Sequence, residues 1–152
     1  MKTRDLIRQQ LDNKIVGLQE LNNIVLPPQG WIYSIRQAIN MSLRQLGNKL
    51  SITPQSVKEI EEREKNGTIS LKVLRQVAAA LNMKFVYGFI PIEKTLEGML
   101  EARAAELARS IVERTSVQME LEDQKNSPER IEKAIKEKAA EIKNEMPKFL
   151  WD

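Results

Sequence analysis

Hydrophobic positions in the middle of the chain recur at helical spacing in two short runs separated by a polar break. Leu43, Leu46 and Leu50 follow one another at intervals of three and four residues. Val57 and Ile60 supply the apolar side of the second run. Because this spacing places apolar side chains on one face of a helix, the pattern predicts two amphipathic helices that share one core.

Polar and small residues mark the junction between these two helices. Thr53 is a good N-cap, and Pro54 suits the first helical position because its missing N–H is not needed there. Gly47 lies four residues before Ser51, and a small residue at that point would let the second helix cross the first closely. The two runs therefore predict a helix-turn-helix, with an ordinary helical hairpin as the alternative.

Polar side chains at the start of the second helix are left facing outward, where they could read DNA. A glutamine can pair with an adenine edge, and a lysine can reach a guanine or a phosphate. The candidate base-reading residues are Pro54, Gln55, Ser56, Lys58 and Glu59.

Further helical patterns flank this pair. Trp31 to Met41 predicts a preceding helix, while Gly67 predicts a turn and Ser70 the cap of a following helix. In this order the chain resembles the Cro/repressor (XRE-type) helix-turn-helix domain. Such domains usually have Gly where this chain has Ser51, and Ser adopts a left-handed turn conformation less readily.

The resemblance also implies two clamps on the DNA backbone. One is the amide end of the helix before the turn, and the other is the loop after the second helix; such contacts position a domain without reading sequence. Arg36, on the preceding helix, is a further candidate phosphate ligand. The full expected set is Arg36, Ser42, Arg44, Gln45, Thr53, Lys65, Asn66, Gly67 and Thr68.

A closer resemblance extends over nearly all of the chain, to the family called mobile mystery protein A. It rests on Gln29-Gly-Trp-Ile32, Ile35-Arg-Gln-Ala-Ile-Asn-Met-Ser42, Gly67-Thr-Ile-Ser-Leu71, Phe85-Val-Tyr-Gly-Phe-Ile-Pro91, Met119-Glu-Leu-Glu-Asp-Gln124 and Leu150-Trp-Asp152. Members are XRE-type regulators typically encoded beside a Fic-domain protein. The resemblance therefore implies a regulator or an antitoxin of a toxin–antitoxin-like pair.

The periodicity changes to two between Met83 and Ile90, which predicts a short strand that ends at Pro91. A lone strand exposes unpaired backbone groups, so it needs a partner. The candidates are Ile24-Val25-Leu26 and a second copy of the segment itself. The predicted dimer residues are Phe85, Val86, Tyr87, Phe89 and Ile90.

Helical patterns also occupy both ends of the chain. Residues 4–21 predict an amphipathic helix, Glu93–Asp123 a long one, and a third opens at Ser127 and stops at Pro147. The two C-terminal helices must bury their apolar stripes on each other, on a second subunit or on another protein. The expected fold is mainly α: a Cro/repressor-like bundle with one short β-strand and a C-terminal helical extension. We expect three segments: an N-terminal amphipathic helix and linker (1–28), the helix-turn-helix domain with the terminal strand (29–90), and a helical tail for dimerisation or partner binding (91–152).

Composition narrows the chemistry. The 152 residues include no Cys and no His, which excludes disulfides, thiolate chemistry, zinc sites and Ser-His-Asp catalysis. We therefore expect no enzyme activity, no metal and no cofactor. The chain also lacks an apolar run long enough to span a bilayer and the apolar core of a signal peptide, so we expect no membrane partner and a cytoplasmic location.

The charge distribution agrees with DNA binding. The net charge of +3 is modest, but residues 31–90 carry nine basic and four acidic side chains, whereas residues 91–152 carry eleven and fourteen. Positive charge is therefore concentrated where phosphate contacts would need it.

Two compatible functions follow. The first is a sequence-specific repressor that binds duplex DNA with an inverted repeat as a homodimer and autoregulates an operon with a Fic-domain protein. The alternative is an antitoxin that binds the Fic partner directly. Fic antitoxins that block the nucleotide pocket carry Ser or Thr, three residues, then Glu and Gly or Asn; here Ser116 and Glu120 approach this motif, but Leu121 follows.

Overall fold

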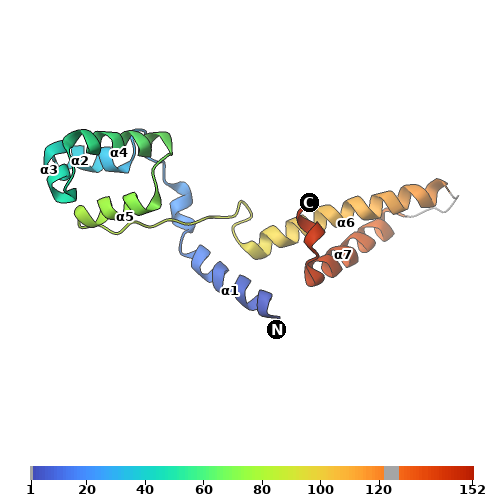
Figure 1. Cartoon of the computed structure of the whole chain (residues 1–152). Helices are drawn as coiled ribbons and strands as arrows, with labels where there is room; N and C mark the ends of the chain where they lie inside the picture. Colours follow the sequence, from blue (N-terminus) through green and yellow to red (C-terminus); the bar gives the residue numbers. More distant parts are fainter. Residues whose placement is uncertain (1, 122–126) are drawn as a thin grey trace. The chain divides into compact units, whose positions relative to one another are not determined.

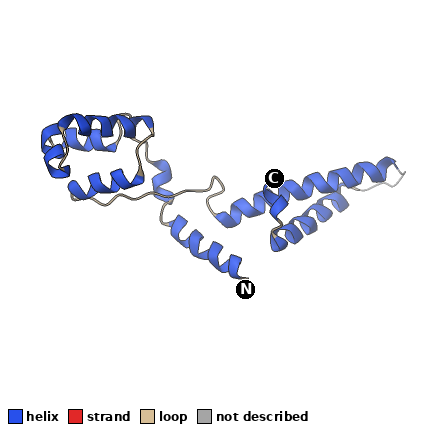
Figure 2. Ribbon diagram, viewed as in Figure 1, coloured by secondary structure: helices blue, strands red, loops and turns tan. Residues whose placement is uncertain are grey.

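The computed structural model describes residues 2–121 and 127–152, and these residues form helices joined by irregular segments (Figures 1 and 2). They divide into two compact units, one built from residues 23–87 and the other from residues 1–22 together with 88–152. The described helices are α1 (Thr3–Val16), α2 (Trp31–Ala38), α3 (Leu43–Leu50), α4 (Pro54–Asn66), α5 (Leu71–Ala80), α6 (Leu96–Leu121) and α7 (Pro128–Glu145), with 3-10 turns η1 (Gln19–Asn23) and η2 (Lys148–Trp151).

The unit of residues 23–87 is a bundle of α2 to α5 around one apolar core (Figure 1). Its fully or nearly buried members are Ile32, Leu46, Val57 and Val77, one from each helix. The remaining apolar residues of the two central helices, including Leu43, Leu50 and Ile60, pack around them half-buried. The predicted shared core of the helix-turn-helix is therefore confirmed.

Local capping signals begin and end these helices as predicted. Ser42 accepts a hydrogen bond from the Gln45 amide, and the Gln45 side chain accepts one from the Ser42 amide, which makes a complete capping box. Thr53 and Ser70 cap α4 and α5 through their hydroxyl oxygens alone, which accept hydrogen bonds from the amides of Ser56 and Val73. Gly67 ends α4 in the left-handed conformation, with φ of 74°.

The turn between α3 and α4 depends on two unusual residues. Gly47 is buried, and a Cβ atom placed on it would lie 2.7 Å from the carbonyl oxygen of Ile52, so the close approach needs glycine. Ser51 follows in the left-handed region with φ of 57° and ψ of 41°. The serine thus adopts the conformation that glycine usually provides here, although non-glycine residues do so at a cost in free energy.

The other unit joins the two ends of the chain. α6 and α7 lie side by side as an antiparallel hairpin, and η2 closes one end of it (Figure 1). The core of the hairpin contains Leu100, Ala104, Ala108, Ile135, Ile142 and Leu150. Of the three partners left open for these apolar stripes, the structure shows the first, because α6 and α7 pack on each other within one chain. The last two residues of the predicted helix Glu93–Asp123 lie outside the described residues.

Polar contacts attach α1 to the first turn of α6. The Asp12 carboxylate accepts hydrogen bonds from the amides of Leu96 and Glu97, at 2.6 and 3.1 Å, and so caps the helix. Arg8 donates from Nε to the Glu97 carboxylate at 2.6 Å, and Lys143 of α7 pairs with the same carboxylate. α1 itself buries no residue fully, so these charges rather than an apolar face position it.

The predicted strand is not confirmed: residues 2–121 and 127–152 contain none, and Met83–Ile90 is irregular. Two side chains of this segment still lie on the same side, as they would in a strand: the rings of Phe85 and Tyr87 stack with their centroids 5.8 Å apart. A strand also requires a hydrogen-bonded neighbour, and Ile24-Val25-Leu26 forms no ladder with this segment. Apolar alternation alone therefore did not make a strand within one chain.

Candidate nucleic-acid interface

The first two turns of α4 present the predicted reading face. Gln55, Lys58 and Glu59 are exposed, and their spacing places them on the side of the helix opposite the buried Val57. Pro54 is exposed at the first helical position. These four candidates are available to a ligand that approaches α4 from solvent.

Ser56 has a different environment from its neighbours. It is half-buried, its amide donates to the Thr53 hydroxyl oxygen at 3.0 Å, and its own hydroxyl oxygen lies 2.9 Å from that of Thr53. The capping hydroxyl of Thr53 is therefore engaged with Ser56. Both residues stabilise the helix start, which leaves less of their hydrogen-bonding capacity for a base or a phosphate.

Arg36 requires a correction, because it is not an exposed phosphate ligand. The residue is only 7% exposed, and its guanidinium donates from Nε and Nη2 to the Glu61 carboxylate at 3.1 and 2.9 Å. Its Nη1 donates to the Met41 carbonyl at 3.0 Å, and the group lies over the Tyr33 ring. Arginine forms such bidentate pairs readily. Here it joins α2 to α4 inside the bundle.

The acidic residues of α4 face in two directions. Glu61 is buried against Arg36, and Glu64 accepts hydrogen bonds from the amides of Trp31 and Ile32 at 2.9 and 2.8 Å. Glu64 therefore caps the N-terminus of α2, where a carboxylate is favourable. Both of these carboxylates thus point away from the exposed face of α4 and pair with α2, not with Arg63 or Lys65, whereas Glu62 is exposed.

These two structural carboxylates were missed as partners of α2, although the sequence held a signal for them. Glu61 follows Val57 by four residues, and Glu64 follows Ile60 by four. Residues four apart share a helix face, so both lie on the inward stripe of α4. A charged residue on such a stripe needs a buried partner.

The first predicted backbone clamp is the N-terminus of α3. Ser42, Arg44 and Gln45 are all exposed there. The capping box occupies the amides of Ser42 and Gln45. The amides of Leu43 and Arg44 form no hydrogen bond in the described part of the chain, so they remain able to bind an anion. The Arg44 side chain adds a positive charge beside them.

The second predicted clamp follows α4. Lys65, Asn66, Gly67 and Thr68 are all exposed. The amides of Gly67 and Thr68 donate to the carbonyls of Glu64 and Arg63 at 3.1 and 2.8 Å, which completes the C-terminal cap. Phosphate contacts from this loop would therefore come from the Lys65 and Asn66 side chains rather than from the loop amides.

The predicted dimer residues are accessible in the single chain. Val86, Tyr87 and Phe89 are exposed, with 57%, 56% and 88% of their surface free, while Phe85 and Ile90 are half-buried. Arg75 lies over the Tyr87 ring, 5.5 Å from its centroid. The segment therefore presents apolar surface that one chain leaves uncovered.

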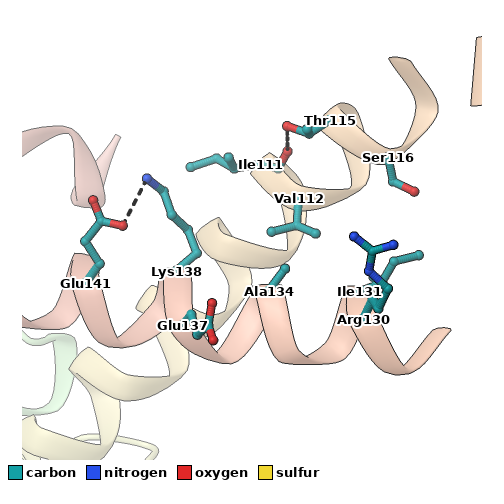
Figure 3. Close-up of a pocket in the computed structure, with 10 residues that line it drawn as sticks. All are labelled: Ile111, Val112, Thr115, Ser116, Arg130, Ile131, Ala134, Glu137, Lys138 and Glu141. Carbon is teal, nitrogen blue, oxygen red and sulfur yellow. Dashed lines mark hydrogen bonds and ion pairs between the residues drawn. The ribbon is translucent and has the colours of Figure 1, made fainter. Parts of the chain in front are cut away.

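A concavity of about 450 Å³ lies between α6 and α7 (Figure 3). Its walls mix apolar side chains such as Ile111 and Val112 with charged ones, and Lys138 pairs with Glu141 across one edge. Within residues 2–121 and 127–152 no three acidic side chains gather as a metal site would require. No helix of these residues is long and apolar enough to cross a membrane.

Residues 23–87 form a four-helix bundle in which the capped helix α4 follows a tight turn and is exposed. This arrangement defines a helix-turn-helix domain. Folds of this class place a helix in the DNA major groove. The helix-turn-helix family matches residues 32–87 of the chain. Comparison with curated proteins and with solved structures gave no match. The domain match supports a DNA-binding regulator of the XRE type.

Proposed function

We propose that this protein is a sequence-specific, DNA-binding transcriptional repressor that acts as a homodimer on an inverted repeat in the cytoplasm. The observation that carries the proposal is the exposed start of α4, where Gln55, Lys58 and Glu59 stand free of partners in the described chain. One such helix contacts only a short half-site, so two copies about one helical turn apart are needed for specificity.

Two groups beside the reading face support a DNA ligand. Arg44 stands beside the free amides at the start of α3, and Lys65 stands at the end of α4. Both are exposed cations at helix ends, where they could hold phosphates on either side of a groove. Such contacts position a domain, whereas the side chains of α4 would select the sequence.

The experiment is footprinting of the chain's own promoter region, combined with binding measurements on the protected site and on random DNA. We expect protection with two-fold symmetry. Gln55→Ala should cost ~1–3 kcal/mol on the specific site and little on random DNA, because glutamine reads an adenine edge. Gln37→Ala is the matched control, since Gln37 is an exposed glutamine on α2. Absence of protection, or protection without symmetry, would contradict the proposal.

The homodimer of the proposal is expected to form through Met83–Ile90. Val86, Tyr87 and Phe89 are largely exposed, and the amides of this segment from Lys84 onward form no hydrogen bond in the described chain. Exposed backbone donors beside apolar side chains favour strand pairing with another chain. An antiparallel pair of identical segments would obey a two-fold axis, as most dimers do. The same axis would relate two copies of α4.

The resemblance to mobile mystery protein A motivates the finer part of the proposal, in which the repressor autoregulates an operon shared with a Fic-domain protein. The antitoxin alternative is favoured by exposed apolar side chains at the ends of the chain, among them Leu6, Ile7, Phe149 and Trp151. Ser116 of the Fic-like motif is buried, which disfavours action through a nucleotide pocket; the Glu120 side chain lies outside the described residues.

Co-expression with the neighbouring gene product, followed by affinity purification of this chain, separates the two roles. A stable complex would support direct binding to the Fic-domain protein. A free protein that shifts its own promoter DNA would support repression alone.

A further inference from the structure

All four acidic residues of the unit formed by residues 23–87 lie in α4, the helix expected to enter the DNA groove. Two of them have structural partners, because Glu61 is paired with Arg36 and Glu64 caps α2. Glu59 and Glu62 are exposed and form neither a hydrogen bond nor an ion pair among the residues described. Neither carboxylate therefore has a structural partner among the residues described.

A free carboxylate on this face opposes DNA binding unless it finds a donor there. Phosphates repel it, and most atoms on the major-groove edges of bases are acceptors. The donors are the exocyclic amines of cytosine and adenine. On adenine the neighbouring N7 is an acceptor that would repel the second carboxylate oxygen, whereas cytosine presents its N4 amine without such a neighbour. Cytosine is therefore the base that suits a carboxylate best.

Helix geometry places Glu59 close to the glutamine that begins the reading face. Residues four apart lie on the same side of a helix, and the axial rise from Gln55 to Glu59 is about 6 Å. Successive base pairs are about 3.4 Å apart along the duplex. A helix lying along the groove would thus bring Glu59 over a base pair about two steps from the one that Gln55 contacts.

We infer that Glu59 is a specificity-determining residue, whose carboxylate accepts a hydrogen bond from cytosine N4 about two base pairs from the site of Gln55. This inference rests on the proposed DNA-binding function and names one base of its half-site. The contact is selective because the phosphates repel the Glu59 carboxylate on any DNA sequence. Only a cytosine at this position offsets that repulsion with a hydrogen bond. Glu59 thereby weakens binding to random sequence.

Glu62 provides a matched control on the same exposed face. It lies seven residues after Gln55, about 10 Å along the axis and in the second half of α4. Base edges are contacted mainly by the N-terminal residues of a recognition helix. Glu62→Gln should therefore remove an equal charge without removing a base contact.

The experiment is selection of binding sites from a randomised duplex pool by the full-length protein, by Glu59→Gln, by Glu59→Ala and by Glu62→Gln. The wild type should enrich cytosine at one position of each half-site. Glu59→Gln should shift that position to adenine, and Glu59→Ala should accept any base, with about tenfold loss of discrimination. The Glu62→Gln variant should bind all sequences more tightly than the wild type does, and it should still select cytosine at the same position.

Two results would overturn the inference, and they differ from failure of the proposed function. Sequence-specific binding with the same selected site for wild type and Glu59→Gln would show that Glu59 reads no base. A change of selected base caused equally by Glu62→Gln would show a general charge effect. If the wild-type protein selects no sequence at all, the proposed function itself is refuted, and this inference with it.

Discussion

The Glu61 carboxylate and the Arg36 guanidinium form a bidentate pair inside the helix-turn-helix bundle, with N–O distances of 3.1 and 2.9 Å. The side chains are 7% and 8% exposed, so both charges have left water. Such a pair adds little net stability compared with an apolar pair, but loss of one partner leaves a buried charge uncompensated. The pair therefore holds α4 against α2 and makes each residue dependent on the other.

Glu61→Ala should destabilise this unit by about 3–5 kcal/mol, because the Arg36 guanidinium would remain buried without its counterion. Glu62→Ala, one residue along and exposed, should change the free energy of unfolding by less than about 0.5 kcal/mol. The chain has two tryptophans, so urea denaturation in a Trp151→Phe background reports this unit through Trp31. A similarly small decrease in the free energy of unfolding for Glu61→Ala and Glu62→Ala would contradict a buried pair.

Arg44→Ala and Lys65→Ala should weaken binding to specific and random DNA alike and lower the salt dependence of binding by about one unit each. The reason is their position at the expected clamps, where each would release counterions from one phosphate. Titrations at several salt concentrations measure the slope. Lys133→Ala is the control, since Lys133 is an exposed lysine of α7. An unchanged slope for Arg44→Ala and Lys65→Ala would show that both residues are only solvated.

Val86→Pro should leave the monomer folded but disrupt the proposed dimer. The Val86 amide donates no hydrogen bond within the described residues, so a single chain loses no hydrogen bond when proline removes this donor. In a strand shared between two copies, the same change would remove a ladder donor. Light scattering over a range of concentrations tests this for wild type and variant. A wild-type monomer at tens of micromolar would refute the dimer.

The unit that contains α1, α6 and α7 should lose stability in acid, because Glu97 then loses its negative charge. Hydrogen bonds from Lys143 and then Arg8 lower the pKa of this carboxylate. A lowered pKa in the folded state gives stability that is fully present above the ordinary glutamate value of about 4.3 and is lost as pH falls through the folded value. Because Glu97 is 41% exposed, solvent screening keeps the effect to about 1 kcal/mol or less.

The measurement compares wild type with Glu97→Gln at pH 7 and pH 3, by urea denaturation in a Trp31→Phe background that leaves Trp151 as the reporter. Wild type should be the more stable at pH 7, and the difference should shrink at pH 3. Glu113→Gln, which alters an exposed carboxylate of the same helix, should show no such trend. A difference that stays constant with pH would refute the assignment.

Most of the helix-turn-helix could be predicted from the sequence, because its signals are local. Thr53 and Pro54 define the start of α4 through backbone hydrogen bonding within one turn, and Gly67 defines its end through a conformation that glycine favours. The crossing at Gly47 was also predictable, since only a small residue fits beside the Ile52 carbonyl. The exposed Gln55, Lys58 and Glu59 followed from helix periodicity alone.

Tertiary structure decided what periodicity could not, namely which charges have partners and which segments pair. Arg36 reads as a surface cation until Glu61, 25 residues later, is brought against it; likewise Glu64 meets the amides of Trp31 and Ile32 only after folding. The Met83–Ile90 segment has the alternation of a strand, but a strand also needs a hydrogen-bonding edge, and the described chain supplies none. Burial and pairing depend on distant neighbours, so the sequence by itself determined the helices and their caps, and the packing determined the role of each charge.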